Sequence, residues 1–326
     1  MRAAFLAEPG RLSVAEVDEP TAADLEPGQV LVEVLAGGIC GSDMPFFRGS
    51  PNRWAGSSWR GRGAAPGQPG FPMHEVAGRA LASRTEDIPV GSHVVGWANE
   101  FNGLADKVRT DGHSLAPYEK TLAAPNAVLA QPLACVLYAV ERLGNVVGLR
   151  CAVIGLGAIG MLFAHVLTAK GGDVVGVDRV DRSAAFDQLD VGRFVRSDSE
   201  PWAELLSDAE RPEVVVEAVG HQVSTLRDAI TAVALSGRIF YFGVPDDDVY
   251  PINMESMVRK NLALMAGGTL DRRRMLSEAL EYLEQHPDLH SLVTHVVPLA
   301  EAQRAYDLVN ASANRLKVVV SMLSGV

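Results

Sequence analysis

Cysteine is scarce in this sequence, with only Cys40, Cys135 and Cys151 among 326 residues. A small, odd number of cysteines argues against a disulfide framework and favours a reducing compartment. We therefore expect a cytoplasmic location. Long apolar runs are also missing, since none approaches the roughly 20 residues that a membrane helix needs. Glu8 and Pro9 interrupt the first ten residues, which predicts a first strand rather than a signal peptide.

Positive charge is in deficit, because 29 Lys and Arg residues face 40 Asp and Glu residues, for a formal net charge of −11. An acidic surface repels phosphate backbones, so this balance argues against a nucleic-acid partner. Gly and Pro are plentiful but dispersed, which disfavours disorder. A chain of 326 residues that is 48% hydrophobic is too long for one small core and predicts two domains.

Short β-branched runs dominate residues 1 to about 110. Gln29–Val34, Val90–Gly96 and Asp106–Arg109 have this character and are separated by Gly, Pro and Asp. The pattern predicts a β-rich domain that could close into a barrel.

The segment between Arg48 and Phe71 shows no usable periodicity. A loop of this length is usually functional or disordered, so its aromatic and cationic side chains either wall a pocket or belong to a mobile surface flap. These side chains are Arg53, Trp54, Trp59, Arg60 and Arg62.

Strands alternate with helices from about residue 126, which predicts an α/β, doubly wound parallel sheet. The expected strands are Cys151–Ile154, Val174–Asp178, Val214–Glu217 and Arg238–Phe242. The expected helices are Val128–Leu143, a helix ending near Lys170, residues 199–208, residues 222–235 and Asp271–Gln285. Leu292–Val297 and Lys317–Met322 read as strands of the first domain. We therefore expect a discontinuous first domain, residues 1–131 and 290–326, and a second domain at 132–289.

Gly155, Gly157 and Gly160 match the pattern G-x-G-x-x-G, with Ala158 and Ile159 in the variable positions. They follow a predicted strand and open a predicted helix, as dinucleotide binding requires, although glycines can also serve packing alone. Asp178 ends the next strand 18 residues after Gly160. Its carboxylate would accept hydrogen bonds from ribose hydroxyls and repel a 2′-phosphate, which favours NAD over NADP. Arg179 and Arg182 weaken that preference.

Cys40 follows an apolar strand, and His74 and Glu75 come 34 residues later. A thiolate and a neutral imidazole are common zinc ligands, with a carboxylate or water completing the set. Taken singly, a Cys is more often a small core residue and a His a satisfied polar one.

Several segments in order resemble the zinc-dependent medium-chain dehydrogenase/reductase family of alcohol, sorbitol and threonine dehydrogenases. They are Gly38–Asp43, Pro72–Gly78, Gln131–Ala134, the glycine pattern, Glu217–Gly220, Phe242–Pro245 and Thr294–Leu299. The resemblance implies a GroES-like β-barrel catalytic domain with a Rossmann domain inserted, and a homodimer or homotetramer. The sheet edge near Arg238–Val244 is the expected contact between copies.

By the same resemblance, Cys40 and His74 are zinc ligands, and Glu75 binds the metal or stands just behind it. Gln131 occupies a position where relatives place a further ligand. Asp43 would hold the ring of His74 from its far nitrogen. Cys135, one helical turn after Gln131, is read as core or as a substitute ligand. The nicotinamide would lie against Gly243, Val244, Gly267 and Gly268.

The chain departs from the family in four places. The four-cysteine lobe for a structural zinc is missing after Trp97, so one catalytic zinc per chain is expected. Met73 replaces a usual Gly, and Met44–Pro45 replace a His of the proton relay. The loop between Cys40 and His74 is longer than usual.

The resulting hypothesis is transfer of hydride between a secondary alcohol, such as a polyol, sugar or aminocyclitol, and NAD. Zinc would lower the pKa of the alcohol, and Ser42 would pass its proton towards ribose hydroxyls and water. Two alternatives stay open: a zinc-free, NADPH-dependent reductase of activated C=C or C=O bonds, and a non-catalytic dinucleotide-binding protein.

Overall fold

The computed structural model describes residues 1–50, 67–247, 249–311 and 314–323. Two compact units are present, the first formed by Met1–Ala134 with Leu270–Val326 and the second by Cys135–Thr269. The first unit is discontinuous, as predicted, but its second segment starts near residue 270 instead of 290. Of the residues between Arg48 and Phe71 considered for a pocket or flap, Arg53, Trp54, Trp59, Arg60 and Arg62 lie outside the described ranges.

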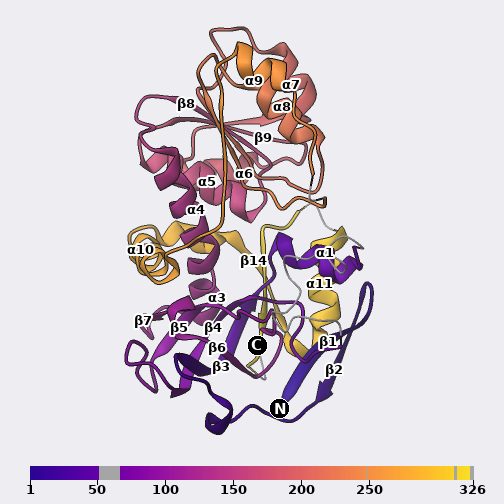
Figure 1. Cartoon of the computed structure of the whole chain (residues 1–326), viewed down its shortest axis with the longest axis vertical. Coiled ribbons are helices and arrows are strands. Elements are labelled where there is room, and N and C mark those ends of the chain that lie inside the picture. The colour runs from indigo at the N-terminus through magenta and orange to yellow at the C-terminus, as the bar shows by residue number, and fades with distance from the viewer. Residues whose placement is uncertain (51–66, 248, 312–313, 324–326) are drawn as a thin grey trace. The chain divides into compact units, whose positions relative to one another are not determined.

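The first unit is built on a seven-stranded sheet with the order β14-β15-β3-β4-β5-β7, and β6 pairs with β3 off this path. All neighbours are antiparallel except β14 and β15. The hairpin β1–β2 lies beside it (Figure 1). The strands are β1 (Arg2–Glu8), β2 (Arg11–Glu16), β3 (Gln29–Gly38), β4 (Glu75–Ser83), β5 (His93–Trp97), β6 (Lys107–Asp111), β7 (Leu115–Tyr118), β14 (Val293–Pro298) and β15 (Lys317–Ser321).

Helices of the first unit are short, apart from α10 and α11. They are α1 (Met44–Arg48), α3 (Ala124–Ala127), α10 (Arg272–Gln285) and α11 (Ala302–Ala311), with 3-10 turns at η1 (Ala22–Asp24), η2 (Gly41–Asp43), η3 (Gly112–Ser114), η4 (Pro287–Leu292) and η5 (Leu299–Glu301). The helix α4 (Ala130–Leu143) starts in the first unit and ends in the second. Phe47, Phe71 and Tyr306 are among the largest side chains of one continuous apolar core.

Two arginines explain why α10 belongs to the first unit. Arg272 donates to Asn99 Oδ1 (2.8 Å) and Ser114 Oγ (2.9 Å), and its guanidinium lies 4.9 Å from the centre of the Trp97 ring. Arg273 donates to the Gly112 carbonyl (2.7 Å). The amphipathic pattern of this helix identifies a helix but not its partner, so its sequence alone could not assign it to either unit.

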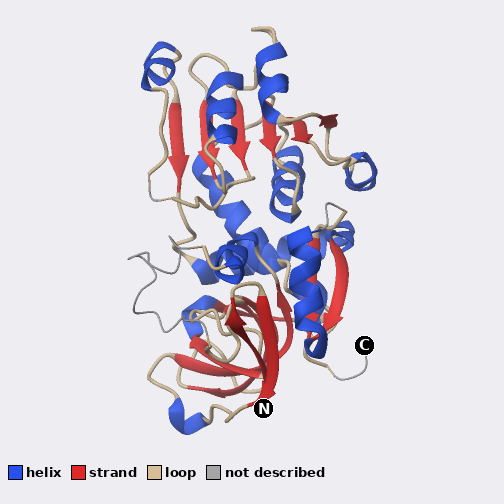
Figure 2. Ribbon diagram, turned by 90° about the vertical axis from the view of Figure 1, so that its right-hand side faces the viewer, coloured by secondary structure: helices blue, strands red, loops and turns tan. Residues whose placement is uncertain are grey.

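The second unit is a six-stranded, all-parallel sheet with the order β10-β9-β8-β11-β12-β13. Its strands are β8 (Arg150–Ile154), β9 (Asp173–Asp178), β10 (Arg193–Arg196), β11 (Val214–Glu217), β12 (Arg238–Tyr241) and β13 (Ala263–Ala266). Helices cover both faces (Figure 2). Figure 1 shows α5 (Ala158–Ala169) and α6 (Ser183–Leu189) on one face, and α7 (Ser199–Leu205), α8 (Ser224–Ala232) and α9 (Met254–Arg259) on the other. This is the predicted doubly wound α/β architecture.

The strand order reverses between β8 and β11, because β9 and β10 extend the sheet to one side and β12 and β13 to the other. In open parallel sheets, ligands bind outside the carboxyl ends of the strands at such a point. The expectation that Arg238–Val244 forms the sheet edge is wrong. β12 is covered by β13, a short strand without β-branched residues that the sequence pattern did not reveal.

None of the helices in the described ranges is long and apolar enough to span a membrane.

Candidate functional site

Strand pairing brings the predicted metal ligands together. Gly38, at the end of β3, pairs with Glu75, at the start of β4, so the turn that carries Cys40 lies beside His74. Cys40, His74 and Glu75 each offer one ligand atom, and these three atoms lie within 4.8 Å of one another. We call these three residues the metal cluster. The structure therefore brings together predicted ligands that lie 34 residues apart in the sequence.

Asp43 organises both loops of the metal cluster. Its side chain is completely buried, with Oδ2 accepting from the backbone N–H of Cys40 (2.9 Å) and Oδ1 2.7 Å from His74 Nδ1. Burial lowers the pKa of His74, but Asp43 and Cys40 outweigh that effect and raise it well above its usual value. With Nδ1 held by Asp43, Nε2 is the nitrogen left to a metal, as predicted for a carboxylate behind a ligand histidine.

Glu75 lies fully buried between two polar partners. Its Oε2 forms an ion-pair contact with Lys317 Nζ, and Lys317 is itself only 3% exposed. Gln131 is 3% exposed and is assigned with its amide oxygen towards Trp97 Nε1 (2.6 Å) and its amide nitrogen towards Glu75 Oε1 (3.2 Å), since this orientation satisfies both neighbours. The amide of Gln131 thus has protein partners on both atoms.

These donors fit zinc. Thiolate sulfur, imidazole nitrogen and carboxylate oxygen are the ligand types that zinc takes. Glu75 Oε2 is a buried oxygen, and the Lys317 ammonium is its ion-pair partner.

Other predicted members of the centre have distinct placements. Ser42 is half-buried in the 3-10 turn η2, between Cys40 and Asp43. Met73 is fully buried, and its backbone N–H donates to the Phe101 carbonyl (2.9 Å), so a large side chain fits in the loop before His74. Cys135 is half-buried in α4 and does not belong to the metal cluster.

Tyr306, on α11, reaches the same loop from the opposite end of the chain. Its ring is fully buried and lies 5.0 Å from the Phe47 ring, and its hydroxyl donates to the carbonyl of Pro72, two residues before His74. Burial, and after it the acidic groups of the site, raise the pKa of Tyr306 well above its ordinary value. The phenol therefore stays protonated and remains a donor.

Gly155 and Gly157 form the turn from β8 into α5, and Gly160 lies in the first turn of that helix. Gly155 has φ +89°, and a Cβ there would lie 2.4 Å from a methyl carbon of Val219. A Cβ on Gly160 would lie 1.8 Å from the Gly155 carbonyl oxygen, so this glycine allows close packing of helix and strand. A Cβ on Gly157 would meet no atom within 4 Å, so the space beside it is open, as ligand approach requires.

Asp178 braces this turn from the end of β9. Its Oδ2 accepts from the Leu156 N–H (2.7 Å) and its Oδ1 from the Val180 N–H (2.8 Å). Each carboxylate oxygen can accept a further hydrogen bond, so ribose hydroxyls can still be bound. Arg179 is exposed, whereas Arg182 is half-buried with a buried Nε. Burial lowers the pKa of Arg182, and Asp178 opposes that shift.

Two further loops follow β11 and β12 at the same edge of the sheet. These two loops are residues 218–221 and 243–246. We call them, together with residues 155–160, the carboxyl-edge loops. Glu217 is fully buried, and its Oε1 accepts from the N–H groups of Val219 and Gly220 (both 3.0 Å). A Cβ on Gly243 would lie 2.1 Å from the Gly220 nitrogen, so the two loops are in tight contact.

His221 and Asp246 join the same two loops, with 2.8 Å between His221 Nδ1 and Asp246 Oδ1. Val244 belongs to this pair of loops, since its carbonyl accepts from the His221 N–H (2.8 Å). Gly267 and Gly268 follow β13 at the same edge. The structure thus places every predicted dinucleotide-binding residue on or beside the carboxyl edge.

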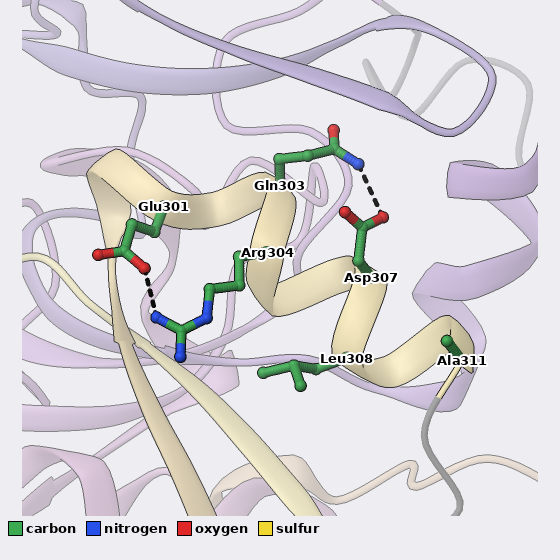
Figure 3. A pocket seen from close by; sticks show the side chains of 6 residues that line it. All are labelled: Glu301, Gln303, Arg304, Asp307, Leu308 and Ala311. Atoms are coloured by element: carbon green, nitrogen blue, oxygen red, sulfur yellow. Dashed lines mark hydrogen bonds and ion pairs between the residues drawn. The ribbon is translucent and has the colours of Figure 1, made fainter.

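A separate open cavity of about 600 Å³ lies on the exposed side of α11 (Figure 3). Its polar side chains are paired with one another, Gln303 with Asp307 (2.9 Å) and Arg304 with Glu301 (2.6 Å). The buried Tyr306 of the same helix does not line it. This hollow offers no converging reactive groups.

Sequence reasoning missed Lys317, Tyr306, Trp97 and the pair His221–Asp246. The sequence predicted a strand that contains Lys317 but gave this lysine no role. A lysine at the start of a strand as apolar as Val318–Val320 is nevertheless a sign that its charge has a buried partner. Tyr306 carried no such signal, because an aromatic residue on an amphipathic helix is ordinary core.

The first unit carries a thiolate–imidazole–carboxylate cluster, and the second is a doubly wound parallel sheet of the dinucleotide-binding type. This combination is typical of two-domain oxidoreductases. Comparison with known families agrees. The family model of the alcohol dehydrogenase GroES-like domain matches residues 26–135, and that of the glucose dehydrogenase C-terminus matches residues 124–322. The chain belongs to the zinc-type medium-chain alcohol dehydrogenase family and is an oxidoreductase of CH–OH groups. The predicted GroES-like and Rossmann domains are thereby confirmed.

Individual relatives cover nearly the whole chain. D-altritol 5-dehydrogenase of Agrobacterium fabrum is 30% identical over 92% of this chain and 94% of its own length. D-arabinitol dehydrogenase 1 of Uromyces fabae is 24% identical over 98% of this chain and 97% of its own. Alcohol dehydrogenase TADH from Thermus sp. ATN1 has the same fold, with a TM-score of 0.83 and 23% identity over 99% of this chain and 100% of its own.

Proposed function

We propose that this protein oxidises a secondary hydroxyl of a sugar alcohol or related polyol with NAD, or catalyses the reverse reduction, at one zinc ion per chain. The observation that carries the proposal is the metal cluster, in which Asp43 holds Cys40 and His74 in place. Relatives named as altritol and arabinitol dehydrogenases support a polyol as the substrate class.

Zinc, when bound, would supply a Lewis acid that lowers the pKa of the substrate hydroxyl. The chain's own residues would do the rest. Cys40, His74 and Glu75 would hold the ion, with Asp43 fixing the ring of His74. Ser42, half-buried between Cys40 and Asp43, would take up the hydroxyl proton and hand it towards solvent. Because Met44–Pro45 replace the relay histidine, that route depends on Ser42.

The carboxyl-edge loops would bind the dinucleotide, with its pyrophosphate at the amino end of α5 beside Gly157. We propose NAD because the Asp178 carboxylate, at the end of β9, would repel a 2′-phosphate bound near it. Replacement Asp178→Asn should reduce the preference for NAD over NADP about tenfold, since a charge-assisted hydrogen bond is lost. The ratio of kcat/KM for the two coenzymes measures this, and an unchanged ratio would refute the assignment of Asp178.

Two finer points belong to the proposal. A four-cysteine structural zinc site cannot form from Cys40, Cys135 and Cys151 alone, so one zinc per chain is proposed. We also propose a homodimer through β13, whose outer edge has no partner strand in the described residues. On α9, the helix before β13, Met254 and Val258 are 62% and 74% exposed. Light scattering gives the mass in solution. The cytoplasmic location stays a prediction from the scarce cysteines.

The test combines metal content with a substrate panel. Protein purified without chelators is assayed by plasma mass spectrometry and then offered sugar alcohols with NAD or NADP. About one zinc per chain and NADH production from a polyol support the proposal. If the protein holds no zinc and reduces enones with NADPH, the zinc-free reductase replaces the proposed function. If it binds NAD tightly but turns over no substrate, the protein is a non-catalytic dinucleotide-binding protein. The variant Cys40→Ala should lose zinc. Cys151 is a buried cysteine of β8 outside the metal cluster, so the control variant Cys151→Ala should keep the zinc.

A further inference from the structure

Lys317 is an unusual neighbour for a cation site. It begins β15, is 3% exposed, and places its ammonium against Glu75 Oε2. Nζ also donates to the carbonyl of Ile39 (3.2 Å), the residue before Cys40. Charged lysines are almost never fully buried unless they are paired, so Glu75 is the partner that keeps this ammonium in the interior.

The backbone is shaped to permit this pair. A Cβ on Gly38 would lie 2.2 Å from Glu75 Oε2 and 2.8 Å from Lys317 Cε, so only glycine leaves room for both side chains. Register places them there, because Gly38 pairs with Glu75 on β4 and with Val319 on β15. The pair is therefore held by three strands and is not a chance surface contact.

The two oxygens of Glu75 have different tasks. Oε1 is held by the Gln131 amide, which is itself held by Trp97. Oε2 faces Lys317 as an ion pair, and since Oε1 is held by Gln131, Oε2 would be the oxygen available to a metal. A dication and an ammonium would then compete for the same oxygen, and the two cations would repel each other across a buried space of low dielectric.

We propose that Lys317 is a positioning and charge-balancing residue of the metal centre, which shares Glu75 Oε2 with the zinc and so weakens the hold of the protein on the ion. The inference rests on the proposed function for the metal, but it concerns only this chain's residues. With Lys317 the centre offers zinc a net charge of −1 from Cys40, Glu75 and the lysine, and without it −2. A less negative set leaves the ion more electrophilic and more weakly bound.

The deciding variant is Lys317→Met, which keeps the apolar stem of the side chain out to Cε and removes the ammonium group. Zinc affinity is measured by competition with a chromophoric chelator, on metal-free protein reloaded under identical conditions. We expect the dissociation constant to fall by about tenfold or more, on the scale of known outer-shell effects. Lys317→Arg, which keeps the charge, should stay close to the natural protein. An unchanged or weaker affinity in Lys317→Met would overturn the proposal.

Cobalt substitution supplies a second readout. If Lys317 competes for Glu75, the visible and thiolate charge-transfer bands of the cobalt protein should shift between the natural protein and Lys317→Met. The same substitution made on a Glu75→Gln background should not shift these bands relative to Glu75→Gln alone. Equal shifts in both backgrounds would refute the role of Glu75. Should Lys317→Met fail to fold, Lys317→Gln is titrated in the same way with the same expectation.

A purely structural role predicts a different pattern, namely lower thermal stability with unchanged zinc affinity. Lys107→Met is the matched control, because Lys107 pairs with Glu19 (2.7 Å) in the same unit but outside the metal cluster. It should not alter the affinity for zinc. If the natural protein binds zinc but oxidises no polyol, the proposed function fails while the affinity difference at Lys317 can still be tested.

Discussion

The metal cluster of the first unit is made of side chains, whereas the carboxyl-edge loops of the second unit present mostly backbone. In the first, the three predicted ligands are held by charge and hydrogen bonds from Asp43, Gln131 and Lys317. Tyr306 holds the loop before His74 through the Pro72 carbonyl. In the second, glycines clear space, and Asp178 and Glu217 hold the turns through backbone N–H groups. Anion binding by free N–H groups needs no side-chain donor at all.

This difference determines how each site responds to substitution. A side-chain centre fails when a donor atom is removed, and its neighbours tune it. A backbone site fails when atoms are added, because a Cβ either blocks the ligand or collides with the protein. The following changes test that contrast, beginning with the largest expected effect.

Removal of a ligand should affect the first unit alone. Cys40→Ala should lower kcat/KM for the alcohol by about a thousandfold or more, because Lewis-acid stabilisation is worth several kcal/mol. The dissociation constant of NAD, followed by NADH fluorescence quenching, should change little. A parallel loss of NAD affinity would contradict the separation of the two sites.

Glycine-to-alanine substitutions in the second unit should distinguish a glycine that leaves room for the ligand from one that permits close packing of the protein. Gly157→Ala meets no protein atom, so thermal stability should be kept while NAD affinity falls about tenfold or more. Gly160→Ala collides with the Gly155 carbonyl, so it should lower the melting temperature and NAD affinity together. Calorimetry and NAD titration compare the two. If both variants behave alike, open space beside Gly157 is not the ligand site.

The third change removes a single hydrogen bond from the ligand loop. Tyr306→Phe leaves the ring packed against Phe47 and should cost about 1 kcal/mol of folding free energy. Because the lost bond holds Pro72, two residues before His74, zinc should also dissociate more readily. Denaturant unfolding and chelator competition measure the two effects. A stability loss without any change in zinc release would make Tyr306 a packing residue only.

The smallest change concerns the pH dependence of the second unit. Burial raises the pKa of Glu217 above its ordinary 4.5, although backbone N–H groups such as that of Gly220 oppose the shift. The folded state therefore favours the protonated form, so this group's contribution to stability is full below pH 4.5 and is lost as the pH rises through the folded pKa. In Glu217→Gln this loss of stability with rising pH should be absent. The free energy of unfolding of the variant, relative to that of the natural protein, should therefore increase from acid to neutral pH.

Urea unfolding at several pH values shows the difference. Glu204→Gln, at an exposed position on α7, is the control and should follow the natural protein. A constant offset between Glu217→Gln and the natural protein at all pH values would show that Glu217 does not titrate in this range.

The same contrast explains what could be predicted from the sequence. The coenzyme turn depends on local spacing, so Gly155, Gly157, Gly160 and Asp178 were identifiable from one strand–turn–helix segment. Cys40, His74 and Glu75 were proposed as ligands largely through a family resemblance, and the structure brings their side chains together. Their surroundings were not predictable, because Lys317 and Ile39 are 278 residues apart and Tyr306 and Pro72 are 234 apart.

Architecture shows the same limit. The alternation of strands and helices predicted the doubly wound sheet, and Val214–Glu217 was placed correctly to the residue. β13 was missed because Ala263–Ala266 lacks β-branched residues, so its place at the edge came only from pairing with β12. Asp271–Gln285 was predicted as a helix, but its membership of the first unit depends on Arg272 and Arg273, whose partners are distant in sequence.

The position of Lys317 on β15 has a consequence for biosynthesis. A ribosome makes Cys40, His74 and Glu75 first, then the whole of the second unit, and only afterwards the strand that carries Lys317. Until that strand emerges, Glu75 has no counter-charge and β3 lacks one of its neighbours. The first unit, and with it the surroundings of Glu75, can therefore reach its final arrangement only after nearly the whole chain has been made.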